Sequence, residues 1–387
     1  MEATTNNRKS RWNNWVSFCE PLAIDPYLQK TEFRHRVGAL MAFAVTIRQG
    51  LYGRGAQVQC STVTSAITAV GQTIAMATGV NPTKVTGSER FLLQLQIQLA
   101  GYTKEDPPTK KKLPVEADVP ELLIDMAYTN KGDTFAQAAA DLALIAFYYL
   151  LRIGEYTIKS TTEIGKWNKK QTIQFKLEDV TFFSKDKKGR IRQLPRNAST
   201  RDVMTADSAT LKLDNQKNGW KAACIHQEVN GEHIKCPVRA LARRVLHLRQ
   251  HKASGKTFLC KVYDKAGERY VCAGDVSAGL KVAANILQYP LTRGIPISSV
   301  DTHSLRSGGA NALALSGYTD TQIQKMGRWK GKTFKEYIRE DLACYSVGMS
   351  TSMKRNFKFV NIAGNIYNDI TEECVDREYD GVATRAA

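Results

Sequence analysis

The chain has 387 residues, 43% of them hydrophobic, which is enough for two or three domains with sizeable cores. Its 55 lysines and arginines against 37 aspartates and glutamates leave a formal net charge of +18, an excess typical of proteins that bind nucleic acid, although solubility or an unrelated basic enzyme would also account for it. No apolar run reaches about 18 residues, which excludes a membrane span, and the N-terminus lacks the apolar stretch of a secretory signal, so we expect an intracellular protein with reduced thiols.

The first hundred residues carry apolar side chains at helical spacing. Breaks that contain glycine or proline separate four such segments, which predict helices over residues 12–18, 33–47, 63–76 and 91–99. We therefore predict a compact helical domain over residues 1–102.

Residues 103–118 interrupt the helical pattern. They contain several prolines and a run of three lysines, a composition typical of a linker. The three lysines are candidates for contacts with DNA phosphates, and a solvated charge run is the alternative. They are Lys110, Lys111 and Lys112.

Residues 119–350 mix helical and strand patterns and predict a second, α+β domain. The predicted helices cover residues 135–151, 240–248, 276–287, 307–316, 321–326 and 334–338, and the predicted strands cover residues 176–183, 210–213 and 220–225. The fold class that follows is mostly α with a small antiparallel β-sheet. Between the first two strands, residues 184–209 predict a basic surface loop that touches the DNA backbone or faces water. Its candidate DNA contacts are Lys185, Lys187, Lys188 and Arg190.

Two Asn-Gly pairs, at residues 218–219 and 230–231, predict β-hairpins, because type I′ turns need positive φ at both central positions. The second hairpin bears on a possible zinc site, since two cysteines and two histidines flank it, namely Cys224, His226, His233 and Cys236. In the predicted register Ile225 faces Cys236, which turns Cys236 away from the other three. The eight cysteines also contain no C-x-x-C pair, and we expect no metal.

Two further segments carry residues suited to anion chemistry, and a third, residues 326–338, places a tryptophan and a tyrosine within a basic stretch. Arg152 and Glu155 follow a strongly apolar helix, and an arginine in such surroundings needs an anion. His303 and Arg306 are three residues apart, so on a helix they share a face and can bind the same anion. Each of these signals is weak alone.

In combination they resemble the tyrosine recombinase (integrase) family. The resemblance rests on Leu-Arg-Ile-Gly-Glu at residues 151–155, His-Ser-Leu-Arg at 303–306, Gly-Arg-Trp at 327–329 and Tyr-Ile at 337–338, in that order. It covers about residues 8–345. Details such as Cys-Pro-Val-Arg-Ala-Leu at 236–241 look most like the Crypton- and DIRS-type recombinases of eukaryotic mobile elements. The resemblance implies a SAM-like core-binding domain over residues 1–102 and a catalytic domain over residues 119–350.

The resemblance also implies roles for five side chains at one scissile phosphate. Arg152 and Arg306 would clamp its non-bridging oxygens with guanidinium forks. His303, with an ordinary pKa of about 6.5, would bind the same phosphate and handle the proton of the nucleophile. Trp329 would donate its indole N–H. Tyr337 would attack phosphorus and form a 3′-phosphotyrosyl link.

The family supplies the proton for the leaving 5′-oxygen from a lysine in a strand turn. Lys217, beside the first Asn-Gly pair, matches that place, and Lys212 and Lys221 lie near enough to be alternatives. Glu155 matches an acidic family position and would orient and neutralise cationic groups. An ordinary charge at a helix end is the other interpretation of Glu155.

The spacing of the last motif departs from the family pattern. Trp329 precedes Tyr337 by eight residues where many members have nine, and counting nine back reaches Arg328. Either the connecting turn is shorter, which we favour, or Arg328 faces the phosphate or DNA and Trp329 belongs to the core. Tyr345 is a rival nucleophile, eight residues beyond Tyr337.

The function that the resemblance implies is that of a site-specific recombinase in DNA integration or transposition, associated with DNA in the cell and nuclear if the host is eukaryotic. It would cut and rejoin double-stranded DNA without metal, ATP or another cofactor, as a homo-tetramer on paired sites. Residues 351–387 would form a tail that docks on a neighbouring protomer or on its own domain. The alternatives are a recombinase-derived DNA-binding protein that no longer cuts, and a type IB topoisomerase.

Overall fold

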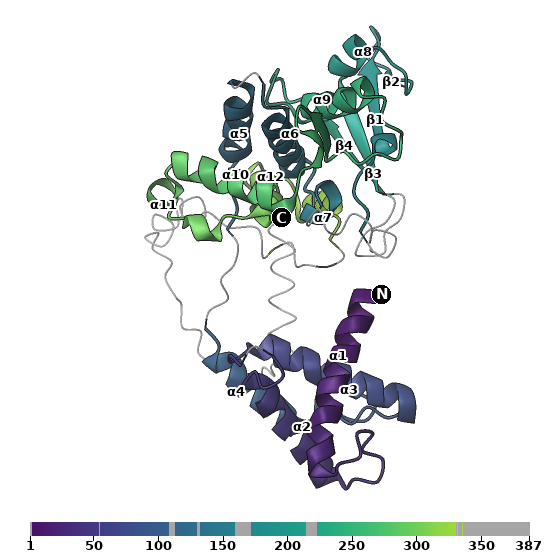
Figure 1. Ribbon diagram of the computed structural model, residues 1–387, viewed down its shortest axis with the longest axis vertical. Helices are drawn as coiled ribbons and strands as arrows, with labels where there is room; N and C mark the ends of the chain where they lie inside the picture. The colour runs from purple at the N-terminus through teal and green to yellow at the C-terminus, as the bar shows by residue number, and fades with distance from the viewer. Residues whose placement is uncertain are drawn as a thin grey trace, which may run out of the picture. The chain divides into compact units, whose positions relative to one another are not determined.

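The computed structural model describes residues 2–53, 55–107, 113–129, 132–158, 172–213, 223–329, 331 and 335. Over these residues the chain is mostly helical, with one four-stranded and one two-stranded antiparallel sheet (Figure 1). The predicted fold class, mostly α with a small antiparallel sheet, is confirmed. None of the described helices is long and apolar enough to cross a membrane.

The four helices predicted in the first hundred residues are present and share a core of their own. They are α1 (Glu2–Cys19), α2 (Phe33–Arg48), α3 (Cys60–Thr78) and α4 (Leu93–Glu105). Trp15, Phe43, Ile67 and Leu95 are fully buried in that core. Helix α1 begins ten residues before its predicted start, because its first residues are polar and carry no apolar periodicity.

Helix α4 includes the first three residues of the predicted linker, which begins at residue 103. The next residue, Asp106, is tied to the helical domain, since its carboxylate accepts a hydrogen bond from the backbone N–H of Cys60 (2.7 Å) and forms an ion pair with buried Arg48. The hydrogen bond from Arg48 holds the pKa of Asp106 below its usual value. Proline and lysine content alone gave no sign of this ion pair.

A second core surrounds α6 (Thr134–Tyr148), which is apolar almost all round and is therefore buried. Four helices pack against it (Figure 1). They are α5 (Asp118–Thr129), α9 (Pro237–Gln250), α10 (Ala273–Ile286) and α12 (Thr302–Leu315). Helix α5 was not predicted from the sequence, because it begins at the end of the proline-rich linker. The remaining helices are α7 (Ile153–Tyr156), α8 (Thr200–Met204), α11 (Tyr289–Thr292) and α13 (Asp320–Gly327).

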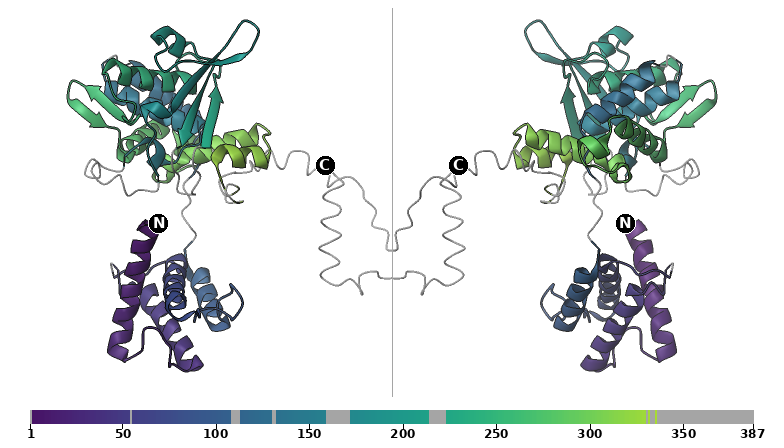
Figure 2. Two further views of the ribbon diagram at one scale, coloured as in Figure 1. Left: turned by 90° about the vertical axis from the view of Figure 1, so that its right-hand side faces the viewer. Right: turned by 90° about the vertical axis from the view of Figure 1, so that its left-hand side faces the viewer.

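The larger sheet has the strand order β2-β1-β3-β4, and α9 packs against β3 and β4 (Figure 2). Its strands are β1 (Val180–Lys185), β2 (Ile191–Gln193), β3 (Ser208–Leu213) and β4 (Ala223–Glu228). The loop predicted over residues 184–209 is therefore wrong, because this segment forms the β1–β2 hairpin and helix α8. Strand β2 is exposed on both faces and lacks the apolar alternation that would have revealed it.

The predicted hairpin at residues 230–231 is also wrong. Strand β4 ends at Glu228, and Asn230 then forms a turn in which its side chain accepts from the N–H of Glu232 (3.1 Å) and donates to the carbonyl of Lys235 (3.1 Å). The turn leads into α9, so the register that separated Cys224 from Cys236 does not exist. Within the described parts of the chain, no group of three His, Cys, Asp or Glu side chains is placed to hold a metal ion.

A hairpin that the sequence analysis missed follows α9. Strands β5 (Lys261–Asp264) and β6 (Gly267–Tyr270) pair through a tight turn in which Gly267 has a φ of +102°. The other predicted hairpin, at residues 218–219, lies outside the described residues.

Candidate functional site

Helix α6 ends in a turn that contains a left-handed leucine. Leu150 has a φ of +50°, its N–H donates to the carbonyl of Phe147 (3.4 Å), and the N–H of Leu151 donates to the carbonyl of Ala146 (2.9 Å). These two hydrogen bonds form a Schellman motif, in which the left-handed position is usually glycine. Because the left-handed conformation costs an L-residue about 1–2 kcal/mol, other contacts must stabilise Leu150 there.

The carbonyl oxygen of Leu150 accepts hydrogen bonds from two guanidinium groups. Arg306 donates through Nη1 and Arg328 through Nη2, the latter at 2.8 Å. Arg306 Nη2 also donates to the carbonyl of Gly327. The side chain of Leu150 packs in a small buried cluster with Trp329. Since hydrogen bonds from charged donors are strong, these contacts fix the end of α6.

Arg152 lies two residues beyond Leu150, at the start of α7. The carboxylate of Glu155 accepts from the backbone N–H of Arg152 (Oε2, 2.9 Å) and pairs with its guanidinium (Oε1 to Nη1, 3.2 Å). Glu155 Oε2 also pairs with Arg328 Nη2 at 3.1 Å. Glu155 is fully buried, whereas the side chain of Arg152 is 22% exposed. The buried carboxylate of Glu155 therefore forms ion pairs with both Arg152 and Arg328, and of these two arginines Arg152 reaches the surface.

Helix α12 carries His303 and Arg306 one turn apart. Asp301 caps this helix: its carboxylate accepts from the N–H of Thr302 (2.6 Å), and its own N–H donates to Oγ of Ser304 (3.1 Å). His303 is exposed in the first turn, where the helix dipole favours anions. Arg306 is only 2% exposed.

Two consecutive glycines bring α12 against the end of α6. A Cβ atom on Gly308 would overlap the carbonyl of Val115, and one on Gly309 would overlap the carbonyl of Phe147. This close approach places Arg306 within reach of the turn after α6. Glycines inside a predicted helix are an unfavourable choice, so the pair was a visible sign of close packing that the sequence analysis did not use.

The surroundings of His303 favour its neutral form. Loss of water around the inner side of the imidazole and the positive charges of Arg306 and Arg152 lower its pKa below 6.5, and Asp301 opposes the shift. Although the ring is exposed, it therefore stays neutral at neutral pH and can accept a proton.

Trp329 and Arg328 are both buried, at 6% and 3% exposure. The guanidinium of Arg306 lies over the Trp329 ring, 4.2 Å from its centroid, which is a cation–π contact. Trp329 thus belongs to the core, as in the less favoured sequence interpretation. Arg328 was a candidate DNA contact, but its guanidinium faces Leu150 and Glu155, and burial lowers its pKa although Glu155 opposes that shift.

The other predicted site residues are divided between the surface and the undescribed parts of the chain. Lys187 and Lys188 are exposed at the tip of the β1–β2 hairpin; beside them Lys185 pairs with Glu228 (3.5 Å) and Arg190 with Asp186 (2.7 Å). Lys212 is exposed on β3. Outside the described residues lie Lys110, Lys111, Lys112, Lys217, Lys221, Tyr337 and Tyr345.

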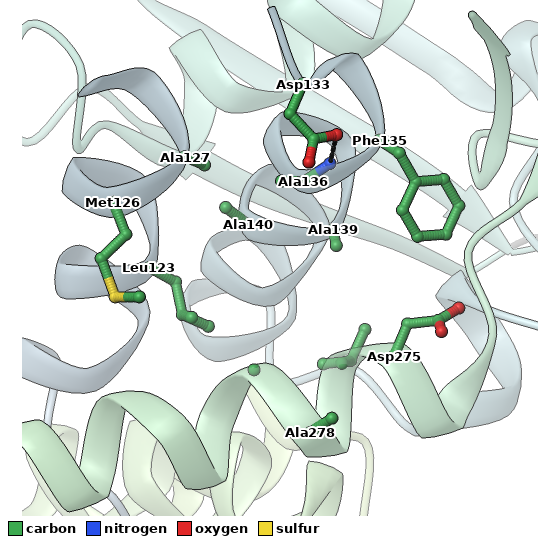
Figure 3. Close-up of a pocket in the computed structure, with 12 residues that line it drawn as sticks. Leu123, Met126, Ala127, Asp133, Phe135, Ala136, Ala139, Ala140, Asp275 and Ala278 are labelled. Carbon is green, nitrogen blue, oxygen red and sulfur yellow. Dashed lines mark hydrogen bonds between the residues drawn. The ribbon is translucent and has the colours of Figure 1, made fainter. Parts of the chain in front are cut away.

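A pocket of about 410 Å³ lies apart from these arginines, between α5, α6 and α10 (Figure 3). Its lining is largely apolar, and its two carboxylates are used as helix caps. Asp133 accepts from the N–H of Ala136 (2.9 Å), and Asp275 accepts from the N–H of Cys272 (2.8 Å). None of the residues proposed for chemistry lines this pocket.

The sequence matches no protein-family model and no curated protein. The structure is similar to that of the Tn1549 transposon integrase in complex with transposon right end DNA, with 13% sequence identity and a TM-score of 0.41 over 81% of this chain and 84% of that chain. A lambda integrase dimer bound to a COC′ core site has 13% sequence identity and a TM-score of 0.37 over 90% of this chain and 91% of that chain. XerA recombinase has 14% sequence identity and a TM-score of 0.35 over 90% of this chain and 100% of that chain. None of the three supports the more specific resemblance to Crypton- and DIRS-type recombinases. With identities this low and TM-scores below 0.5, these similarities say nothing of the chemistry of this chain.

We predict that Leu150→Gly is more stable than Leu150→Ala. Both variants lose the packing against Trp329, but glycine adopts a positive φ without the steric cost that alanine keeps. The difference in the free energy of unfolding should be about 1 kcal/mol, measured by chemical denaturation. Equal stability, or a more stable alanine variant, would contradict a strained turn.

We predict that His303 titrates below pH 6.5 in the DNA-free protein, because partial burial and two neighbouring arginines favour the neutral ring. An NMR titration of the histidine Hε1 resonances measures this, and His303→Asn assigns the signal. A midpoint at or above 6.5 would show that the positive charges do not act on this ring.

Proposed function

We propose that the chain is a tyrosine recombinase that cleaves and rejoins double-stranded DNA through a 3′-phosphotyrosyl intermediate. The observation that carries the proposal is the convergence of Arg152, His303 and Arg306, from segments about 150 residues apart, on the turn after α6. Two arginines and a neutral histidine around one point suit a phosphodiester that gains negative charge in the transition state.

In the proposed reaction, each catalytic side chain has one role in cleavage and the opposite role in rejoining. The phenol oxygen of Tyr337 attacks phosphorus, and its proton passes to His303. The 5′-oxygen leaves with a proton from Lys217. The phosphotyrosyl ester keeps the bond energy of the phosphodiester, so a 5′-hydroxyl can reverse the step and join a new strand without ATP or metal.

The burial of Arg306 restricts how it would contact the phosphate. Its two terminal nitrogens donate to the carbonyls of Leu150 and Gly327. Each of these nitrogens carries a second hydrogen, so one guanidinium can hold the turn and still donate to an anion placed beside Arg152. Arg152, which is partly exposed, would make the outer contact.

The remaining features of the proposal concern DNA and assembly. The net charge of +18 and the exposed Lys187 and Lys188 support binding to phosphates along a duplex. Recombination between two sites would require a homo-tetramer, with residues 351–387 docking between protomers. We keep an origin in a eukaryotic mobile element of the Crypton or DIRS type, and hence a nuclear location, as part of the proposal.

A second candidate function is a recombinase-derived protein that binds DNA without cutting it. The deep burial of Arg306 and Trp329 favours it, because both side chains already have protein partners. The two candidates differ in whether a covalent intermediate forms.

We predict that the protein forms an SDS-resistant adduct with a nicked suicide DNA substrate and that Tyr337→Phe abolishes it, because only the phenol supplies the nucleophile. Gel electrophoresis measures the adduct and a mobility shift measures binding, which should stay within about twofold, since one hydroxyl is lost. Tyr345→Phe is the matched control and should keep the adduct. An adduct that survives Tyr337→Phe refutes the assignment, and no adduct in the natural protein supports the second candidate.

We predict that Arg152→Ala slows single-turnover cleavage by about a hundredfold or more, because the guanidinium acts mainly on charge that develops in the transition state. DNA affinity should fall much less, because many other cations contact the duplex. Rapid-quench cleavage and filter binding separate the two effects. Equal losses in rate and affinity would make Arg152 a simple binding residue.

A further inference from the structure

Glu155 presents an electrostatic problem at the centre of the site. Its carboxylate is fully buried and lies 3.2 Å from the guanidinium of Arg152, the arginine that reaches the surface. A carboxylate so close competes with any incoming anion for the same guanidinium. If Glu155 acted on Arg152 alone, the pair would be close to neutral, and an anion would gain little there.

Arg328 gives the same carboxylate a second partner. Its Nη2 lies 3.1 Å from Glu155 Oε2 and 2.8 Å from the carbonyl oxygen of Leu150. One nitrogen therefore ties the carboxylate to the turn after α6. Glu155 therefore pairs with two positive charges, and its single negative charge neutralises each of them only in part.

Arg328 has a left-handed backbone conformation, which glycine would adopt more easily, and this indicates independently that the arginine side chain is needed at this position. Helix α13 ends as α6 does: Arg328 has a φ of +57°, its N–H donates to the carbonyl of Lys325 (3.1 Å), and the N–H of Trp329 donates to the carbonyl of Gln324 (3.0 Å). Glycine would adopt this conformation without strain. Each helix end thus has a larger residue in a left-handed position, and the two residues, Leu150 and Arg328, contact each other.

We propose that Arg328 is a positioning residue that draws Glu155 towards the turn after α6 and so leaves Arg152 able to bind an anion. The inference rests on the proposed function only for the identity of that anion, a DNA phosphate. The site itself is defined by the contacts among Leu150, Arg152, Glu155 and Arg328. Arg328 does not touch the anion, and its effect reaches the anion through Glu155 and Arg152.

The test measures the binding of inorganic phosphate to the full chain, followed by the His303 resonance. Arg328→Met should weaken phosphate binding about tenfold, a coupling typical of residues in one hydrogen-bonded network. Arg328→Lys should stay within about threefold, since a single nitrogen makes both contacts in the natural protein. Adding Glu155→Gln to Arg328→Met should restore binding to within about threefold, because the competing charge is gone.

The rescue by Glu155→Gln separates this role from a purely structural one, which the second substitution would not repair. If Arg328→Met binds phosphate as the natural protein does, or if the double variant stays weak, the inference is wrong. Absence of phosphate binding in the natural protein also overturns it. If Arg328→Met does not fold, Glu155→Gln alone decides: tighter phosphate binding supports the competition, and unchanged or weaker binding refutes it.

Phosphate binding and DNA cleavage are read separately, so the two proposals can fail separately. A protein that binds phosphate as predicted but forms no DNA adduct would keep the role of Arg328 and lose the recombinase. If the protein cleaves DNA but Arg328→Met does not change phosphate binding, the recombinase function is supported and the proposed role of Arg328 is wrong.

Discussion

The site depends on one backbone carbonyl. The oxygen of Leu150 accepts from Arg306, which comes from α12, and from Arg328, which follows α13. Neither bond would form if α6 continued, because a helical carbonyl is used inside the helix. The left-handed turn frees this oxygen, and the two arginines in turn stabilise a conformation that leucine would otherwise avoid. The two glycines of α12 make the approach possible.

The same turn sets the electrostatics of the surface. Arg152 follows directly after it, and Glu155, buried behind Arg152, is shared with Arg328. Partial burial, together with the positive charges of Arg306 and Arg152, lowers the pKa of the exposed His303. A neutral histidine beside guanidinium groups can take a proton while the arginines hold an anion. The backbone geometry and the proposed chemistry therefore have a common origin.

Sequence patterns predicted the parts of the fold that follow from local periodicity. The four N-terminal helices, α6 and α9 carry regular apolar spacing, and the strands β1 and β3 carry alternation. The sequence patterns failed where contacts between distant segments determine the local structure. Strand β2 was missed because it is exposed on both faces and carries no apolar alternation. The hairpin predicted at residues 230–231 was wrong because the side chain of Asn230 donates to the carbonyl of Lys235 in a turn that leads into α9. For the site, the motifs pointed to Arg152, His303 and Arg306. They did not predict the burial of Arg328, because a guanidinium is buried only when carbonyl and carboxylate partners from distant segments meet it.

The most direct test is an experimental structure of the protein with a DNA duplex that carries its cleavage site. We expect one backbone phosphate within about 3.2 Å of donors on Arg152, His303 and Arg306, while Arg328 keeps its contacts with Glu155 and the carbonyl of Leu150. A phosphate bound away from these three side chains, or an Arg328 that leaves Glu155 to contact the DNA, would contradict it.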